Sequence, residues 1–375
     1  MGDSSDGVEL ADRASGLSES DALAYIGFSL LPVWTWRDLG ERLRAGDPPA
    51  AALDRFLSKR PLKRGCPPCS LIELMLRAEA ALASARAHGL VPIVWSDSAY
   101  PSALAAIVDP PPVLWTRGSL AAFDRPAVAI VGSRAASAYA LEVAERLGAD
   151  LAAQGVTVVS GLARGVDSAA HRGAVTAGGL TIAVLGCGAD IIYPREHGDL
   201  ARRIEASGLI LSELAPGTRP LPQFFPQRNR VISGLSRSVV IVEAGERSGS
   251  LITARCALDQ GRDVLAVPGN ILSGRNRGGH GLLRDGAKIV ETADDILEEL
   301  GTFGASNLAR GLRSAPETAA PADPLLAWFS LGEACDLDAI AERSGLSSAR
   351  LLPRLLELEL LGKIRRVGAG RFMRV

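Results

Sequence analysis

The middle third of the chain alternates short, almost uninterrupted apolar runs with longer segments of helical periodicity. The clearest run is residues 127–131, which read Ala-Val-Ala-Ile-Val and precede a helical pattern over residues 137–154. Further apolar runs of strand length lie at residues 156–160, 180–185, 209–212, 238–243 and 263–267. Strands that are apolar along their whole length must be covered on both faces, as in a parallel sheet between two helical layers. We therefore predict a doubly wound α/β domain over residues 88–300.

The segments before this domain are predicted to differ from it and from each other. Residues 1–18 are mostly polar, and we expect them to be disordered. Residues 19–87 carry helical patterns that are broken by Pro-rich joints. That pattern is typical of a small α-helical domain.

The C-terminal part begins after a linker, which we place at residues 301–322 because Gly, Ala, Ser and Pro are prominent there. Residues 323–375 show three short helical patterns, near 324–330, 337–344 and 347–361, followed by a basic segment that reads as a two-stranded ribbon. This outline predicts a winged-helix domain. The outer face of its third helix mixes arginines with glutamates, so DNA contact and a protein-contact or regulatory role both remain open.

The whole chain is nearly neutral, with 41 Lys and Arg, 42 Asp and Glu, and a net charge of −1. Any contact with nucleic acid is therefore expected through a local patch. Five cysteines without a signal peptide indicate a reducing compartment, and the lone Cys66-Pro-Pro-Cys69 pair lacks the second ligand pair that zinc needs. No apolar run reaches the ~18 residues of a membrane span. We predict a cytoplasmic protein with no membrane span, metal or cofactor.

Polar turns that suit an anion follow several of the predicted strands. Gly132-Ser133-Arg134 comes after the first strand, and a turn with Gly161 and Arg164 comes after the second. Ligands of doubly wound sheets bind at the carboxyl ends of the strands, where glycines and helix N-termini accept phosphate. Glycine and serine at such joints are also ordinary turn residues. The convergence of several arginine-bearing turns on one sheet edge nevertheless predicts an anion site there.

Two further segments strengthen this prediction. The run that begins at Phe225 places Arg228, Asn229 and Arg230 ahead of an apolar helix, and residues 214–242 contain four arginines and no acid. The small-residue run Ser248-Gly249-Ser250 opens another helix. Guanidinium groups bind phosphate in a bidentate manner. No Walker motif is present, so ATP-driven work is not expected.

Taken in order, the motifs over residues 90–290 resemble the DNA-processing protein A family (DprA, also called Smf). The matching motifs are Tyr100-Pro101, residues 109–111, 132–134 and 160–167, Tyr193-Pro194, Ser212-Glu213, the Phe-Pro-x-Arg-Asn-Arg run, residues 247–254, Pro268-Gly269 and Gly286-Ala287. The resemblance implies an extended Rossmann domain that binds single-stranded DNA, a homodimer, and transfer of the strand to RecA recombinase in natural transformation and recombination. It also implies a sterile-alpha-motif-like N-terminal domain and a winged-helix C-terminal domain.

The resemblance also assigns roles to residues. Arg134 would hold a phosphate, Phe225 would stack on a base, and Arg228 and Arg230 would supply charge or brace the loop. Arg230 with Asn229 is alternatively a buried structural network. Gly161, Ser248, Gly249 and Ser250 would offer backbone donors. The predicted DNA-binding set is Gly132, Ser133, Arg134, Gly161, Arg164, Phe225, Arg228, Asn229, Arg230, Ser248, Gly249 and Ser250.

Two positions leave questions open. Some relatives carry a lysine just upstream of the Phe-Pro run, where this chain has Pro222 and Gln223, and Arg219 is the candidate substitute. The segment 280–290 resembles the part used in family dimer contacts. Its Leu282-Leu283 pair fits an interface and a core equally well.

A competing hypothesis is a nucleotide-cleaving enzyme, because the framework is also similar to the lysine-decarboxylase-like (LOG) family. The acid of that family's motif corresponds to Thr253 here. A threonine cannot act as a carboxylate base. We therefore predict a binding protein and not an enzyme; a winged-helix transcription regulator with a sensory Rossmann domain is a third hypothesis.

Overall fold

The structure is a computed structural model that describes residues 18–59, 70–301, 325–326, 329, 334–360, 363–367 and 371–374. Disorder was predicted for residues 1–18, of which 1–17 lie outside the described residues, while Ser18 caps the first helix. The Cys66–Cys69 pair and almost all of the predicted linker also lie outside the described residues. The predicted boundaries between the domains stay predictions.

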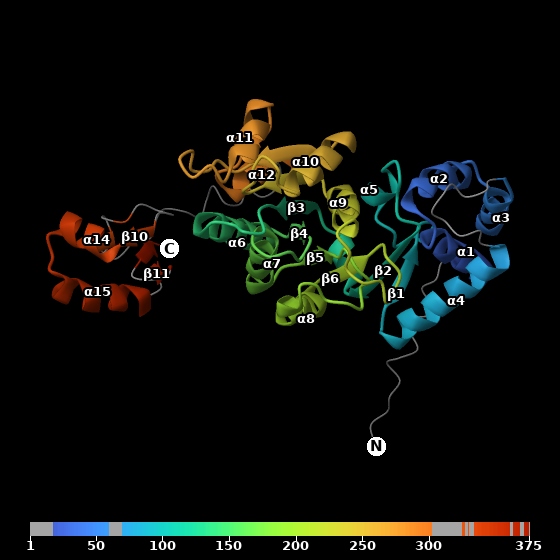
Figure 1. The fold of residues 1–375 in the computed structure, drawn as a ribbon, viewed down its shortest axis with the longest axis horizontal. Helices are drawn as coiled ribbons and strands as arrows, with labels where there is room; N and C mark the ends of the chain where they lie inside the picture. The colour runs from blue at the N-terminus through green and yellow to red at the C-terminus, as the bar shows by residue number, and fades with distance from the viewer. Residues whose placement is uncertain are drawn as a thin grey trace, which may run out of the picture.

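A nine-stranded sheet in the order β1-β2-β6-β5-β4-β3-β7-β8-β9 forms the centre of the protein (Figure 1). Its strands are β1 (Val91–Val94), β2 (Val113–Gly118), β3 (Ala127–Val131), β4 (Thr157–Ser160), β5 (Thr181–Val184), β6 (Leu209–Ser212), β7 (Ser238–Ile241), β8 (Asp263–Ala266) and β9 (Lys288–Ile289). From β6 to β9 all neighbours are parallel, which confirms the predicted doubly wound parallel sheet.

One edge of the sheet is antiparallel. β2 pairs antiparallel with β6, and β1 pairs antiparallel with β2. Residues 95–112 connect the two strands and end in the run Pro110-Pro111-Pro112. The last strand, β9, was not predicted because its two residues are too short to show a pattern.

Helices cover both faces of the sheet. The helices of the central domain are α5 (Ser102–Ala105), α6 (Ala138–Ala153), α7 (Val166–Thr176), α8 (Gly198–Ser207), α9 (Phe224–Leu235), α10 (Ser250–Asp259), α11 (Arg277–Arg284) and α12 (Ala293–Glu299). Alternate residues of β3 point to opposite sides: Ala129 packs in a core with α9 and α10, while Val128 and Ile130 pack in a core with α6 and α7. This two-sided burial explains why the strands are apolar throughout.

The N-terminal helices pack against the antiparallel edge of the sheet. They are α1 (Glu19–Ser29), α2 (Trp36–Arg44), α3 (Pro49–Lys59) and α4 (Leu71–Ala87). Ser18 and Ser70 cap α1 and α4 by accepting a backbone N–H at each N-terminus. Phe28 and Leu74 share one core with Val113 and the fully buried Trp115 of β2. The helical part therefore extends the sheet domain on its antiparallel side.

The C-terminal part has a core of its own. Helices α14 (Leu337–Ser344) and α15 (Ser348–Leu360) pack with strands β10 (Ala334–Asp336), β11 (Ile364–Arg366) and β12 (Arg371–Arg374). The ribbon of β11 and β12 and both helices were predicted. The strand β10, which joins β12, was not, because three residues beside a helix cap carry no strand pattern. The predicted helix near 324–330 falls largely outside the described residues.

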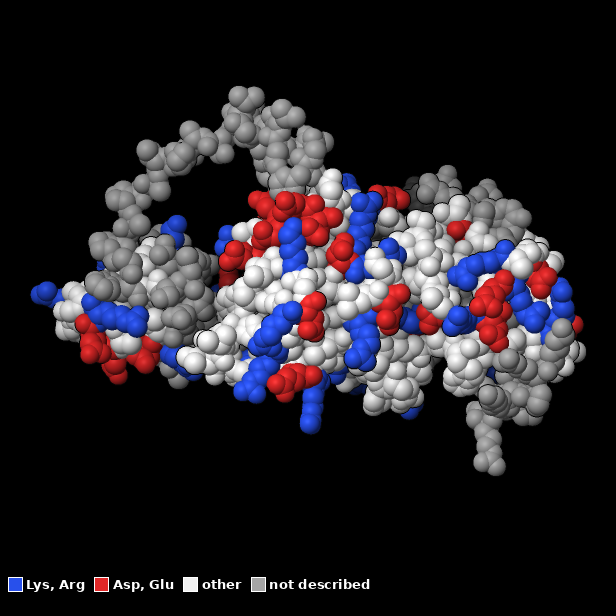
Figure 2. All heavy atoms as spheres, turned by 90° about the horizontal axis from the view of Figure 1, so that it is seen from above, with Lys and Arg blue, Asp and Glu red and all other residues white. Residues whose placement is uncertain are grey.

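Over the described ranges, no helix is both long and apolar enough to cross a bilayer, and no group of three His, Cys, Asp or Glu side chains is arranged to hold a metal. Figure 2 shows Lys and Arg interspersed with Asp and Glu on the face it presents, without one continuous basic field. On this face a polyanion would meet charges of both signs.

Candidate functional site

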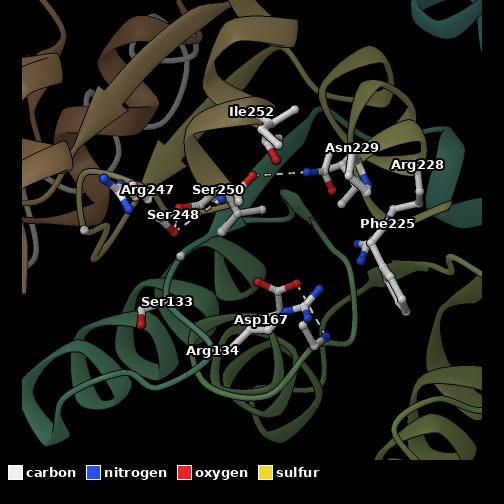
Figure 3. Close-up of a pocket in the computed structure, with 18 of the residues that line it drawn as sticks. Ser133, Arg134, Asp167, Phe225, Arg228, Asn229, Arg247, Ser248, Ser250 and Ile252 are labelled. Carbon is white, nitrogen blue, oxygen red and sulfur yellow. Dashed lines mark hydrogen bonds between the residues drawn. The ribbon is translucent and has the colours of Figure 1, made fainter. Parts of the chain in front are cut away.

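The strand order defines a crevice between β3 and β7. The chain proceeds from β3 through β4 and β5 to β6 on one side, and from β7 through β8 to β9 on the other. Such a reversal opens a gap at the carboxyl ends of the two central strands. A cavity of ≈ 760 Å³ lies there, lined by the turn after β3, the loop after β7 and one face of α9 (Figure 3).

Nine residues of the predicted DNA-binding set line this cavity. They are Gly132, Ser133, Arg134, Phe225, Arg228, Asn229, Ser248, Gly249 and Ser250. Residues from three separate parts of the chain, 132–134, 225–229 and 248–250, are thus brought together. Gly161, Arg164 and Arg230 are not among the lining residues.

Helix α9 presents its residues to the cavity with a regular spacing. Phe225, Arg228, Asn229 and Ile232 line it. They stand at positions i, i+3, i+4 and i+7, which share one face of a helix. The prediction that this run precedes the helix is wrong, because α9 begins at Phe224. Proline is compatible with the first turn, so Pro226 does not delay the helix.

Arg228 is a buried cation that faces the cavity. Its exposed fraction is 4%, and among the described residues its Nε and Nη1 have no hydrogen-bond partner. The guanidinium lies directly against the α-carbon of Gly161, where an added Cβ would stand 1.4 Å from Nη1. Burial lowers the pKa of this group, and the Asp167 carboxylate counteracts that effect. Only glycine leaves the space that Arg228 occupies.

Asp167 supports the loop beneath Arg228. Its Oδ2 accepts the backbone N–H of Gly161 at 3.1 Å and that of Ala163 at 3.4 Å. Burial raises the pKa of Asp167, while Arg228 and these two amides lower it. The prediction that Gly161 offers its amide to a phosphate therefore needs correction, because that amide is already bonded to Asp167.

An aromatic pair and a second arginine form another wall. The Phe225 ring lies 5.5 Å from the Tyr193 ring, and the Cζ of Arg134 lies 5.2 Å from the Phe225 centroid. Tyr193 lines the cavity with 45% of its surface exposed. It was missed as a site residue, although its position in a Tyr-Pro motif was the available signal. The wall offers flat apolar surface beside a cation.

The loop after β7 supplies a third arginine. Arg247 lines the cavity and is exposed, and neither it nor Arg134 forms an ion pair within the described residues. Ser248 and Ser250 share a hydrogen bond of 2.8 Å between their hydroxyls. Asn229 Nδ2 donates to Gly249 O at 3.3 Å, which ties this loop to α9. Arg247 was not predicted as a site residue, although it directly precedes the predicted Ser248-Gly249-Ser250 run.

Arg230 and Arg164 are engaged elsewhere. Arg230 points away from the cavity, where its Nη2 bonds Glu213 and its Nε lies 3.5 Å from Asp109 Oδ2. This arrangement is the buried network that the sequence left open as an alternative, although without Asn229. Arg164 Nε lies 2.5 Å from Glu196 Oε1 at the exposed surface. The structure therefore brings neither arginine into the cavity, and each forms an ion pair outside it. Arg219, the candidate substitute for the missing lysine, does not line the cavity.

The carboxylates near the cavity also have hydrogen-bond partners within the protein. Asp167 is the one carboxylate among its lining residues, and its bonds hold the loop after β4. Glu243 accepts the N–H and the hydroxyl of Ser137 and so stabilises the start of α6. Thr253 lines the cavity at the position where the LOG family carries its acid. The resulting site holds three unpaired arginines and one engaged carboxylate.

Sequence comparison assigns this architecture to a family. The sequence model described as DNA recombination-mediator protein A matches residues 92–301, and that of the DprA winged helix domain matches residues 312–370. The chain belongs to the DNA recombination-mediator protein A family. The predicted family and the predicted winged-helix domain are thereby confirmed.

Relatives in this family span most of the chain. Protein Smf of Escherichia coli (strain K12) is 43% identical over 295 residues, which are 76% of each protein. DNA processing protein DprA of Streptococcus pneumoniae is 46% identical over 203 residues, covering 54% of this chain and 72% of the relative.

Two solved structures of the family resemble this one. The X-ray structure of DprA from Streptococcus pneumoniae has a TM-score of 0.64 and 36% identity, and covers 75% of this chain and 98% of that chain. A structure of DprA from Helicobacter pylori, described with its single-stranded DNA binding mode, has a TM-score of 0.50 and 32% identity, covering 54% and 93% respectively. The fold around the cavity is therefore that of solved DprA proteins.

Proposed function

We propose that the cavity binds the backbone of single-stranded DNA and performs no reaction on it. The observation that carries the proposal is Arg228, a buried guanidinium without an ion pair among the described residues. An unpaired buried cation costs several kcal/mol unless an anion accompanies it. A phosphate in the cavity would supply that anion, and Arg134 and Arg247 would hold neighbouring phosphates.

The lining favours an unpaired strand over a free phosphate. Figure 3 shows Arg247 and Phe225 on opposite sides of the cavity. The cavity therefore offers a cation on one side and an aromatic ring on the other. Stacking of bases on aromatic rings is worth ~1–3 kcal/mol per base and tolerates any sequence. Phe225 and Tyr193 would provide that surface. The Helicobacter pylori relative, studied for single-stranded DNA binding, supports the same ligand.

The same lining argues against the nucleotide-cleaving alternative. Hydrolysis of a glycosidic bond needs a carboxylate that acts as a base or stabilises positive charge. Thr253 provides no carboxylate, and Asp167 is held by two backbone amides below the cavity. Phosphate-binding features without a poised acid suit a binding protein.

Because of the family, the proposal includes two protein partners, RecA recombinase and a second copy of this chain. A recombination mediator would protect incoming or recombining DNA and load RecA on it during natural transformation. The homodimer contact would lie at β9, an edge strand that exposes Ile289. Leu282 and Leu283 pack partly against the core, which supports the core alternative for that pair.

Fluorescence anisotropy with labelled oligo-dT tests the proposal. We expect binding to single strands and much weaker binding to duplex, with no nucleotide turnover by chromatography. Arg228→Ala should weaken binding by about ten- to a hundredfold, the worth of a charged hydrogen bond. The variant should remain folded by circular dichroism, because removing a buried guanidinium without a hydrogen-bond partner offsets the packing lost with its side chain.

Arg146→Ala is the matched control, because Arg146 is an exposed arginine on α6 that pairs only with Asp150. Its affinity should equal that of the wild type. Phe225→Ala should lower affinity and leave the salt dependence unchanged, since no charge is lost. Undiminished oligo-dT binding by Arg228→Ala would remove the cavity from the DNA site.

A further inference from the structure

The 268–277 loop follows β8, ends on Arg277, the first residue of α11, and presents an apolar tip beside the cavity. Ile271 and Leu272 are adjacent and are 79% and 91% exposed, the two highest values among the large hydrophobic side chains of the described residues. Two neighbouring aliphatic side chains left in water indicate a contact surface. Neither side chain belongs to the cavity described above.

The base of this loop is held firmly, so its tip is presented in a defined direction. Asn276 is buried, accepts the N–H of Ala244 at 2.9 Å and donates to Val267 O at 2.9 Å. The hydroxyl of Tyr139 donates to Pro268 O at 3.1 Å. Near the tip, Asn270 Oδ1 accepts the N–H of Leu272 at 2.8 Å. A preorganised surface binds with a smaller ordering cost.

The 268–277 loop adjoins the cavity at two points. Arg275 Nη1 donates to the carbonyl of Ala135 at 3.0 Å, and Ala135 lines the cavity. Arg277 lies 3.8 Å from Glu246, the residue between the cavity-lining Gly245 and Arg247. A chain that leaves the cavity past Arg247 therefore meets this loop next.

The charge of the loop identifies its occupant. Residues 268–277 contain Arg275 and Arg277 and no acid. Cations that flank exposed aliphatic groups match a nucleic-acid strand, whose phosphates need charge and whose unstacked bases pack against leucine and isoleucine. We propose that the 268–277 loop is an accessory surface for single-stranded DNA, where Ile271 and Leu272 contact bases of the DNA that leaves the cavity. This inference rests on the proposed function.

Oligonucleotide length separates this surface from the cavity. An oligo-dT of about four nucleotides would occupy the cavity alone, and one of about twenty would also reach the loop. The double variant Ile271→Ser with Leu272→Ser should bind the short strand as the wild type does. It should bind the long strand about fivefold more weakly, the lower range for one base contact. The pair Ile72→Ser with Leu76→Ser, exposed on α4, is the control and should change neither affinity.

Two charge variants test the same surface, one by removing a positive charge and the other by removing a negative charge. Arg277→Gln should reduce the salt slope of long-strand binding by about 0.7 and leave that of the short strand unchanged. Glu246→Gln frees Arg277 from its exposed partner and should strengthen long-strand binding more than short-strand binding. A merely structural loop would weaken both lengths or neither.

The outcomes distinguish the two proposals. If wild-type protein binds neither strand, the proposed function fails and this inference fails with it. If wild-type protein binds both strands and the loop variants do so equally well, only the accessory surface is refuted. A change in sedimentation of the Ile271 and Leu272 variant without a change in long-strand affinity would identify the loop as a protein contact instead.

Discussion

At the scale of single residues, buried ionisable groups surround the floor of the cavity. His171 lies one turn after Asp167 on α7 and is fully buried. Thr181 donates its hydroxyl proton to Val158 O, so the His171 Nδ1–H donates to Thr181 at 2.7 Å. Burial, with smaller effects from Arg228, His197 and Arg172, lowers the pKa of His171 to about 3. His171 is therefore a packed, hydrogen-bonded helix residue.

His171 makes stability depend on pH. The ordinary pKa is 6.5 and the folded value is about 3, so below pH 6.5 the unfolded chain takes up a proton that the native state refuses. Stability is therefore complete above that pH and falls as the pH decreases, with a slope on the order of 1 kcal/mol per pH unit.

Urea unfolding of the wild type and of His171→Gln at about pH 7 and about pH 5 measures this contribution. The wild type should lose more stability between the two pH values than the variant does. Titrating carboxylates contribute to both proteins and cancel in the difference. Equal losses would show that His171 is protonated in the native state.

At the scale of elements, the site depends on how the loop after β4 meets α9. The loop brings Gly161 against the Arg228 guanidinium, and Asp167 holds it there through two amides. The contact places the cation of one element over the backbone of another. Loop and helix therefore position Arg228 jointly.

Gly161→Ala tests this contact. The new methyl group would stand 1.4 Å from Nη1 of Arg228, the far end of a flexible side chain that moves aside more easily than backbone does. We expect the fold to persist and oligo-dT affinity to fall about as far as in Arg228→Ala. The double variant should be no weaker than Arg228→Ala alone, because both changes remove one interaction. Additive losses measured by anisotropy would mean that Gly161 acts independently.

At the scale of the whole molecule, Arg230 joins three parts of the chain. Its guanidinium bonds Glu213 at the end of β6, donates to Asp109 O at 2.7 Å before β2, and lies 5.4 Å from the ring centroid of Trp36 in the N-terminal helical part. Glu213 also accepts from Gln227 at 3.1 Å. The network connects the antiparallel edge of the sheet, helix α9 and the N-terminal helices.

Arg230→Met should accordingly destabilise the protein by about 3–5 kcal/mol, because it leaves the buried Glu213 carboxylate without its cation. Adding Glu213→Leu should recover part of that loss, since no unpaired charge remains. Thermal unfolding of both variants provides the measurement. At temperatures where it is folded, Arg230→Met should bind oligo-dT as the wild type does, and a selective loss of affinity would return Arg230 to the DNA site.

The sequence by itself determined the doubly wound sheet and the edge where the cavity lies. Strands buried on both faces must be apolar throughout, and the polar turns that follow them gather at one edge for topological reasons. The spacing of Phe225, Arg228, Asn229 and Ile232 also marks one helical face. This spacing is readable in the sequence if the helix includes Pro226, as α9 does.

Only the tertiary structure decided which arginines remain available. Arg228 and Arg230 are two residues apart, yet the helical turn sends one into the cavity and the other to Glu213 and Asp109. Those carboxylates lie 17 and 121 residues away in the chain. An ion pair forms when charges approach within a few ångströms, and no local pattern records an approach between such distant segments.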